Sequence, residues 1–218
     1  MIFKLLDDSF LFPNPALAEA GGLLAVGGDL SPERLLSAYQ NGIFPWFSEG
    51  DPILWYSPHE RCIIFPHRMR VSKSMKSVMK KGDLKITENQ AFADVIFNCA
   101  QAPRAGQEGT WITNEMQEAY IKLNEKGIAK SIEVWQGNEL VGGLYGVEVG
   151  SVFCGESMFS KASNASKMAL IYLAQKQNIK LIDCQLPNEH LISMGAEMIS
   201  REGYMALLVQ QLPNVILT

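Results

Sequence analysis

A carboxylate and a primary amide stand two residues apart in the apolar segment Leu181-Ile182-Asp183-Cys184-Gln185-Leu186. Alternate side chains of a strand share a face, so Asp183 and Gln185 would point the same way. Burying such groups without partners is costly. Asp183 could orient the Gln185 amide toward a reacting group, or both could bind neighbouring backbone at a strand end. The spacing alone favours the second interpretation.

A second candidate is the carboxylate of Glu156, within Phe153-Cys154-Gly155-Glu156-Ser157-Met158-Phe159-Ser160. The preceding glycine would let a ligand or another backbone segment approach closely. Glu156 could therefore hold a cationic substrate group. The alternative is a solvated acid at the end of a strand.

The stretch 44–56 is rich in proline and glycine, which predicts a loop, yet it carries several aromatic residues, among them Trp46. A tryptophan on a loop can stack on an unpaired base. It can also belong to a small apolar cluster beneath the loop. The basic segment that follows favours base stacking.

Positive charge is concentrated in one segment, although the formal net charge of the chain is −4. Asp83 is the one acid among eight cations there, namely Arg61, Arg68, Arg70, Lys73, Lys76, Lys80, Lys81 and Lys85. A lysine stripe is often only a solvated helix face. The size of this excess on an otherwise acidic chain favours contact with phosphates.

Several other classes of protein fit the sequence less well. The four cysteines lack CxxC spacing and the three histidines form no cluster, so we expect reduced thiols and no metal site. Cys154 or Cys184 with His190 could suggest a thiol hydrolase, but no histidine lies in a recognisable partner motif. The sequence shows no apolar run typical of a signal peptide or long enough for a membrane span. The expected location is therefore the cytoplasm.

The hydrophobic pattern predicts an α/β (α+β) protein. Helices are expected after Ser31, at 72–81, near 92–99, from Thr113 to Gly127, at 163–176 and at 201–212, with strands at 131–135, 140–149, 151–156 and 180–186. Strand, helix and strand over 149–186 predict a right-handed crossover. The predicted divisions are an N-terminal domain at 1–62, a basic helical segment and linker at 63–110, and a C-terminal domain at 111–218.

A CoA-dependent acyltransferase would carry a glycine-rich loop for pyrophosphate at the start of the 163–176 helix. This chain has Ser160-Lys161-Ala162-Ser163-Asn164-Ala165-Ser166 there, which counts against CoA. A tRNA-binding module without catalytic activity is a further alternative.

The chain resembles the leucyl/phenylalanyl-tRNA–protein transferase family in motifs that run in order over nearly its whole length. They are Gly27-Gly28-Asp29-Leu30-Ser31-Pro32, Gly42-Ile43-Phe44-Pro45-Trp46-Phe47, Glu108-Gly109-Thr110-Trp111-Ile112-Thr113, Gly142-Gly143-Leu144-Tyr145-Gly146-Val147, the segment 153–160 and Leu181-Ile182-Asp183-Cys184-Gln185. The resemblance implies a small N-terminal domain and an N-acetyltransferase-like C-terminal domain that has exchanged CoA for aminoacyl-tRNA.

It also implies the reaction, which is transfer of Leu or Phe, and less so Met, from tRNA to an N-terminal Arg or Lys, marking the acceptor for N-end-rule degradation. No cofactor, no metal and a monomer are expected. Carried over, Trp46 would stack on the terminal adenosine, and an apolar pocket for the donor side chain would be lined or bordered by Trp111, Tyr120, Leu144, Phe153 and Leu170. Arg68, Arg70, Lys73, Lys76, Lys80 and Lys81 would contact the tRNA backbone.

Asp183, Gln185 and Glu156 would form the catalytic group. The donor ester is already activated, so aligning the amine with the carbonyl is the main task. An ordinary aspartate is too weak a base to take a proton from an ammonium efficiently. We therefore expect Asp183 to act as an electrostatic anchor, Gln185 to hydrogen-bond the amine, and Glu156 to hold polar substrate groups.

Overall fold

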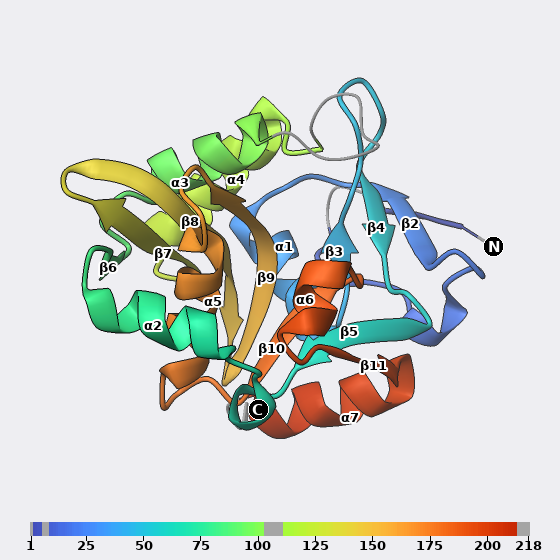
Figure 1. Ribbon diagram of the computed structural model, residues 1–218. Helices are drawn as coiled ribbons and strands as arrows, with labels where there is room; N and C mark the ends of the chain where they lie inside the picture. Colours follow the sequence, from blue (N-terminus) through green and yellow to red (C-terminus); the bar gives the residue numbers. More distant parts are fainter. Residues whose placement is uncertain (1, 6–8, 103–110, 213–218) are drawn as a thin grey trace.

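The computed structural model describes residues 2–5, 9–102 and 111–212, which form two sheets flanked by helices (Figure 1). The smaller sheet has the strand order β1-β2-β4-β3. Its strands are β1 (Phe3–Leu5), β2 (Leu23–Gly27), β3 (Phe44–Pro45) and β4 (Leu54–Tyr56). Within it, β1 and β2 are parallel, whereas β4 is antiparallel to both β2 and β3.

The larger sheet has the order β11-β5-β10-β9-β8-β7-β6. Its strands are β5 (Glu60–Ile64), β6 (Lys85–Glu88), β7 (Ala129–Gln136), β8 (Glu139–Val149), β9 (Val152–Ser160), β10 (Leu181–Gln185) and β11 (Glu197–Ser200). The predicted strand–helix–strand unit is confirmed, because β9 and β10 are parallel and α5 (Ala165–Gln175) connects them. Between β7 and β8 the chain turns at Gly137, which has a φ of 59°.

The other helices are α1 (Pro32–Gln40), α2 (Lys73–Lys81), α3 (Phe92–Gln101), α4 (Asn114–Glu125), α6 (Glu189–Ser193) and α7 (Arg201–Gln211), with short 3-10 turns at Pro15–Leu17 and Pro66–Arg68. The hydroxyls of Ser31, Ser72 and Thr113 accept hydrogen bonds from backbone N–H groups three residues on, as expected of N-caps. None of the helices within the described ranges is long and apolar enough to cross a bilayer.

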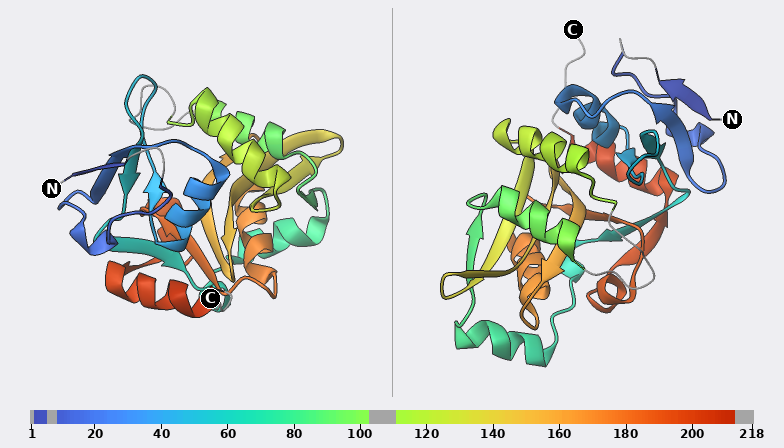
Figure 2. Two further views of the ribbon diagram at one scale, coloured as in Figure 1. Left: turned by 180° about the vertical axis from the view of Figure 1, so that it is seen from behind. Right: turned by 90° about the horizontal axis from the view of Figure 1, so that it is seen from above.

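The larger sheet separates two apolar cores. Helix α5 covers one face, and α3 and α4 cover the other (Figure 2). Strand β8 supplies both cores, because Leu144 packs on the α5 side and its neighbour Tyr145 on the opposite side. Successive residues of β8 and β9 can therefore reach different environments, which positions the candidate site.

Two segments differ from the sequence-based expectation. Residues 85–88 were expected to belong to a linker, but they form the edge strand β6, which pairs with β7. Strand β5 spans the predicted boundary at residue 62 and pairs with β10 and β11. Local pattern did not reveal either strand, because both depend on partners far along the chain. The domain limits themselves stay predictions.

Candidate active site

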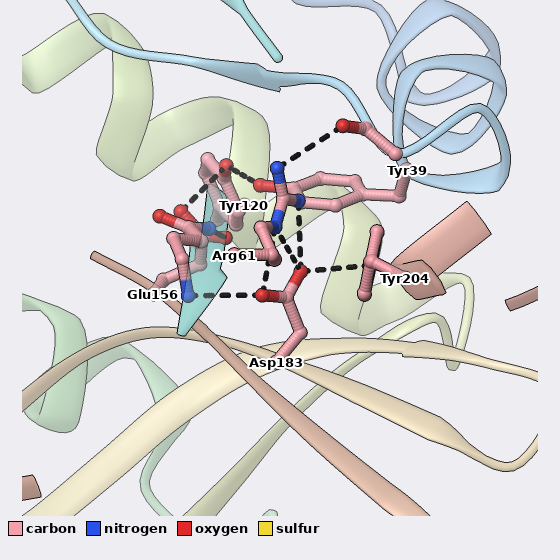
Figure 3. Close-up of polar contacts among 8 residues, drawn as sticks. Tyr39, Arg61, Tyr120, Glu156, Asp183 and Tyr204 are labelled. Atoms are coloured by element: carbon pink, nitrogen blue, oxygen red, sulfur yellow. Dashed lines mark hydrogen bonds and ion pairs between the residues drawn. The ribbon is translucent and has the colours of Figure 1, made fainter. Parts of the chain in front are cut away.

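Asp183 is fully buried and bound to Arg61 of β5 (Figure 3). The Arg61 Nε lies 2.9 Å from Oδ1, and its Nη2 lies 2.8 Å from Oδ2. The Tyr204 hydroxyl of α7 donates a further hydrogen bond of 2.8 Å to Oδ2. Two charge-assisted bonds in a fork geometry fix this carboxylate firmly. Asp183 therefore ties β10 to β5 and α7, and it does not line either of the cavities at the site.

Arg61 is an internal residue with an exposed fraction of 1%. Its Nη1 donates to the carbonyl of Gly42 at 3.1 Å, and its guanidinium lies 4.8 Å and 4.5 Å from the ring centroids of Phe44 and Tyr204. The expectation that Arg61 belongs to a phosphate-binding surface is therefore wrong. Its charge neutralises Asp183 in the interior.

The Asp183 carboxylate also shapes the backbone that carries Gln185. Oδ1 accepts a hydrogen bond of 2.9 Å from the backbone N–H of Gln185, where the register between β10 and β5 shifts. Gln185 has a φ of 61°, an uncommon conformation for a residue other than glycine. Of the two interpretations of Asp183, the structure shows the one in which it binds neighbouring backbone, and no bond joins its carboxylate to the Gln185 side-chain amide. Asp183 holds the bulge, which turns the Gln185 side chain toward another partner.

That partner is Glu156 of β9. The Gln185 Nε2 donates to its Oε1 at 2.8 Å, and the Tyr120 hydroxyl of α4 donates to Oε2 at 3.2 Å. The hydroxyls of Tyr120 and Tyr39 are themselves hydrogen-bonded (Figure 3). Residues from α1, α4 and β10 thus converge on one carboxylate.

Burial raises the pKa of Glu156 from an ordinary 4.5 to about 7, and the negative charge of Asp183 acts in the same direction. Hydrogen bonds from Tyr39, Tyr120 and Gln185 favour the ionised form and offset part of this effect. Only 9% of Glu156 is exposed. A carboxylate with a pKa near neutrality can take up and release a proton under ordinary conditions.

Glu156 borders a mostly apolar cavity of about 650 Å³. Its walls include four of the residues predicted to line the donor pocket, Trp111, Leu144, Phe153 and Leu170. This volume lies within the usual range for small-molecule sites. An aliphatic or aromatic side chain could occupy it.

Tyr120 was also predicted to line or border this pocket. The structure buries it completely and leaves it outside the cavity wall, behind Glu156. Its hydroxyl reaches the site only through the Glu156 carboxylate. Tyr120 therefore contributes a hydrogen bond to Glu156 and no apolar surface to the pocket.

Glycine at position 146 makes room for one wall of the cavity. A Cβ there would lie 2.2 Å from the Cys154 carbonyl oxygen and 2.5 Å from the Phe153 ring. Both separations are well inside van der Waals contact. The close approach of β8 and β9 thus requires glycine and sets the position of Phe153.

A groove of about 280 Å³, smaller than the cavity, lies beside it. Glu156 and Trp111 line both, and Trp46 and Gln185 line the groove. The groove and the cavity are therefore neighbours, with the Glu156 carboxylate at their junction.

The aromatic loop divides between core and surface. Phe44, Phe47 and Trp55 are buried in the core, whereas Trp46 is 36% exposed. The Trp46 ring packs at a tilt on Tyr56, with 5.7 Å between centroids. Trp46 therefore presents part of its ring to the groove, where a planar group could stack on it.

The remaining predicted phosphate-binding residues lie at the surface. Arg68 pairs with Glu197 at 3.1 Å and still has a side chain that is 60% exposed. The others are exposed on α2 or just before it, namely Arg70, Lys73, Lys76, Lys80 and Lys81. These six residues form what we call the basic surface.

Sequence reasoning missed three residues of the site. Arg61 was assigned to the basic segment, whereas Tyr39 of α1 and Tyr204 of α7 were not identified as site residues. Their common property is a polar group buried beside a carboxylate from elsewhere in the chain. The sequence gives no direct signal of such a contact, because the partner of Arg61 lies 122 residues away.

Two family models match the chain. Residues 28–59 match the leucyl/phenylalanyl-tRNA protein transferase N-terminal domain, and residues 63–209 match the leucyl/phenylalanyl-tRNA protein transferase model. Two proteins named leucyl/phenylalanyl-tRNA–protein transferase are similar to this chain. The one from Flavobacterium johnsoniae is 55% identical to it, and the one from Cellvibrio japonicus is 53% identical. The first alignment covers 95% of this chain and 99% of the relative, and the second covers 96% and 91%.

Proposed function

The chain belongs to the leucyl/phenylalanyl-tRNA protein transferase family, and we propose that it moves leucine or phenylalanine from aminoacyl-tRNA to the N-terminal Arg or Lys of an acceptor protein. As a member of this family it is an aminoacyltransferase. Methionine is the expected weaker donor. The modified acceptor is thereby marked for N-end-rule degradation.

The observation that carries this proposal is the apolar cavity that meets a polar groove at Glu156. The side chain of the donated amino acid occupies the cavity, where Phe153 and Leu170 provide apolar contacts. Its ester carbonyl then lies at the junction. An acceptor amine entering along the groove meets that carbonyl beside Glu156 and Gln185.

The reaction exchanges an ester for an amide. The amine nitrogen attacks the carbonyl carbon, one amine proton passes to Glu156, and Glu156 returns that proton to the tRNA ribose oxygen as the ester C–O bond breaks. A base with a pKa of about 7 suits a nucleophile whose own pKa is about 7.7–8.0. Because the Gln185 amide nitrogen is bound to Glu156, its oxygen is the atom that accepts a hydrogen bond from the amine.

Asp183 has an indirect role in this proposal. It fixes the backbone of Gln185 and remains paired with Arg61, so it neither touches the substrate nor transfers the proton. Alignment of the two reactants supplies most of the rate enhancement, since good alignment can lower a barrier by roughly 7–11 kcal/mol.

Two further features support tRNA as the donor's carrier. Trp46 offers an exposed ring at the groove, where the terminal adenosine of an acceptor end stacks. The basic surface carries six cations that bind phosphates of the tRNA body.

The test is transfer of radiolabelled leucine from charged tRNA to a peptide that begins with Arg. The expected product is a peptide longer by one leucine. A matched peptide with an acetylated N-terminus should remain unlabelled, because it has no free amine. Leucyl-CoA in place of charged tRNA should give no product.

Each alternative has its own outcome in this assay. Tight tRNA binding without product on any free-amine peptide would make the chain a tRNA-binding module. Product from the CoA thioester alone would identify a CoA-dependent enzyme. Either result would refute the proposed transfer.

A further inference from the structure

Two cysteines face each other at the bulge that positions Gln185. Cys184 is the residue between Asp183 and Gln185 at the register shift, and Cys62 of β5 is the partner of Gln185 in the ladder. Cys62 and Ile182 belong to the core on the α5 side of the sheet, and Cys184 packs against that core. Because a bulge sets two residues of one strand against one of the other, Cys184 and Cys62 share both a face and a level.

Each thiol affects the titration of the other: the neighbouring Cys184 lowers the pKa of Cys62, and the neighbouring Cys62 raises the pKa of Cys184. Cys62 is fully buried, whereas Cys184 is half-buried and lines both the cavity and the groove. A small oxidant that enters the site therefore meets Cys184 first, with a second sulfur directly behind it.

We propose that Cys62 and Cys184 form a reversible disulfide on exposure to a peroxide, and that this bond switches off aminoacyl transfer. The second half of this statement rests on the proposed function. In the first step one of the two sulfurs attacks one peroxide oxygen, the O–O bond breaks, and a sulfenic acid and water form. The other sulfur then attacks the sulfenic sulfur and releases a second water. Two thiols are oxidised, and the peroxide is reduced to two waters.

The effect on transfer follows from the position of the bond. A disulfide needs a sulfur–sulfur distance of about 2.05 Å, much shorter than any contact between two sulfurs that are not bonded. Closing that gap pulls Cys184 toward β5, and Cys184 is covalently linked to both Asp183 and Gln185. The Gln185 amide then moves relative to Glu156. Since a misplacement of about 1 Å can slow catalysis by about 100-fold, oxidation should lower the transfer rate by at least about tenfold.

The experiment treats the reduced, full-length protein with hydrogen peroxide, blocks free thiols with iodoacetamide under denaturing conditions, and maps all cysteines by mass spectrometry. We expect a peptide pair linked through Cys62 and Cys184, lighter by two hydrogen atoms than the separate peptides, while Cys99 and Cys154 are alkylated. Transfer should fall in parallel with the appearance of this pair. Dithiothreitol should restore both.

The matched variant is Cys62→Ala, which removes the buried sulfur and leaves the residues that line the site. We expect its basal transfer to be unchanged. This variant cannot form the disulfide when peroxide is added. It should therefore lack the loss of transfer activity that the wild type shows and that dithiothreitol reverses.

Three results would overturn the proposal. If peroxide inactivates the wild type while the thiols of Cys62 and Cys184 both remain free, the disulfide is excluded. A complete disulfide with undiminished transfer would exclude the switch. If peroxide inactivates Cys62→Ala as much as the wild type, and dithiothreitol reverses this loss, the inactivation is due to another sulfur. The peptide map requires no transfer activity, so it tests the bond even if the proposed function fails.

Discussion

Replacing Glu156 with glutamine should stabilise the fold at alkaline pH while it slows transfer. Glutamine has nearly the same shape, and its oxygen can still accept from the Gln185 amide. Its nitrogen can donate to the Tyr120 hydroxyl, which can in turn donate to Tyr39. The variant therefore keeps the hydrogen bonds and removes only the buried charge.

The magnitude follows from the pKa of Glu156, which is about 7 in the folded protein against an ordinary 4.5. Because the pKa of Glu156 is higher in the folded protein than in the unfolded chain, folding favours its protonated form. Below pH 4.5 the residue is protonated in both states and costs the fold no stability. Stability is then lost as the pH rises through 7. The difference corresponds to about 3 kcal/mol above that range. Glu156→Gln cannot ionise, so it avoids this loss.

Thermal unfolding of both proteins, measured from about pH 4 to about pH 9, tests the reasoning. The Tm values should coincide at the acid end of this range, and the variant should be higher by on the order of 6–12 °C at about pH 8.5. Wild-type transfer should rise with pH around 7, where Glu156 loses its proton. The variant should transfer at least about 100-fold more slowly, because general base catalysis supplies roughly that factor.

Glu118→Gln is the matched control, because it neutralises an exposed carboxylate on α4. It should alter neither the Tm difference nor the transfer rate. A Glu156→Gln protein that is no more stable at pH 8.5 than the wild type would refute the buried, proton-binding role of Glu156. Undiminished transfer by this variant would remove Glu156 from the mechanism.

Asp183→Ala leaves the Arg61 charge buried without its partner, so unfolding experiments should show a loss of about 3–5 kcal/mol, and an unchanged stability would contradict the anchor role. Trp46→Ala should lower kcat/KM for charged tRNA by an amount equivalent to about 1–3 kcal/mol. If the substitution lowers kcat/KM equally for an aminoacyl-adenosine and for a donor that lacks the base, stacking on the base is refuted. Lys76→Ala should reduce the slope of log Kd for tRNA against log salt by about one, and a slope that stays the same would remove it from the interface. Gly146→Ala should destabilise the fold by about 1–3 kcal/mol, and a wild-type Tm would show that β8 and β9 can separate there without penalty.

Local signals in the sequence predicted much of the scaffold. Ser31, Ser72 and Thr113 cap helices as their residue types suggested, and the change to strand periodicity after residue 128 corresponds to β7, β8 and β9. These features depend on residues within a few positions of one another. They can be read from the chain because capping and side-chain alternation are local properties.

The motifs also predicted the family. Trp111, Leu144, Phe153 and Leu170 line one cavity, and its use as the pocket for the donor side chain stays a prediction. The roles of these residues, the acceptor specificity and the cytoplasmic location stay predictions. They concern partners that lie outside the chain.

What only the tertiary structure decided is the partner of each polar group. The sequence presented Asp183 and Gln185 as a pair on one face of a strand, and Arg61 as one cation among eight. Folding brings Arg61 from β5 and Tyr204 from α7 to Asp183, and directs Gln185 to Glu156. These contacts join strands and helices distant in sequence, and desolvation in the interior makes them strong and moves the pKa of Glu156 toward neutrality. Residue type and spacing carry no measure of that burial.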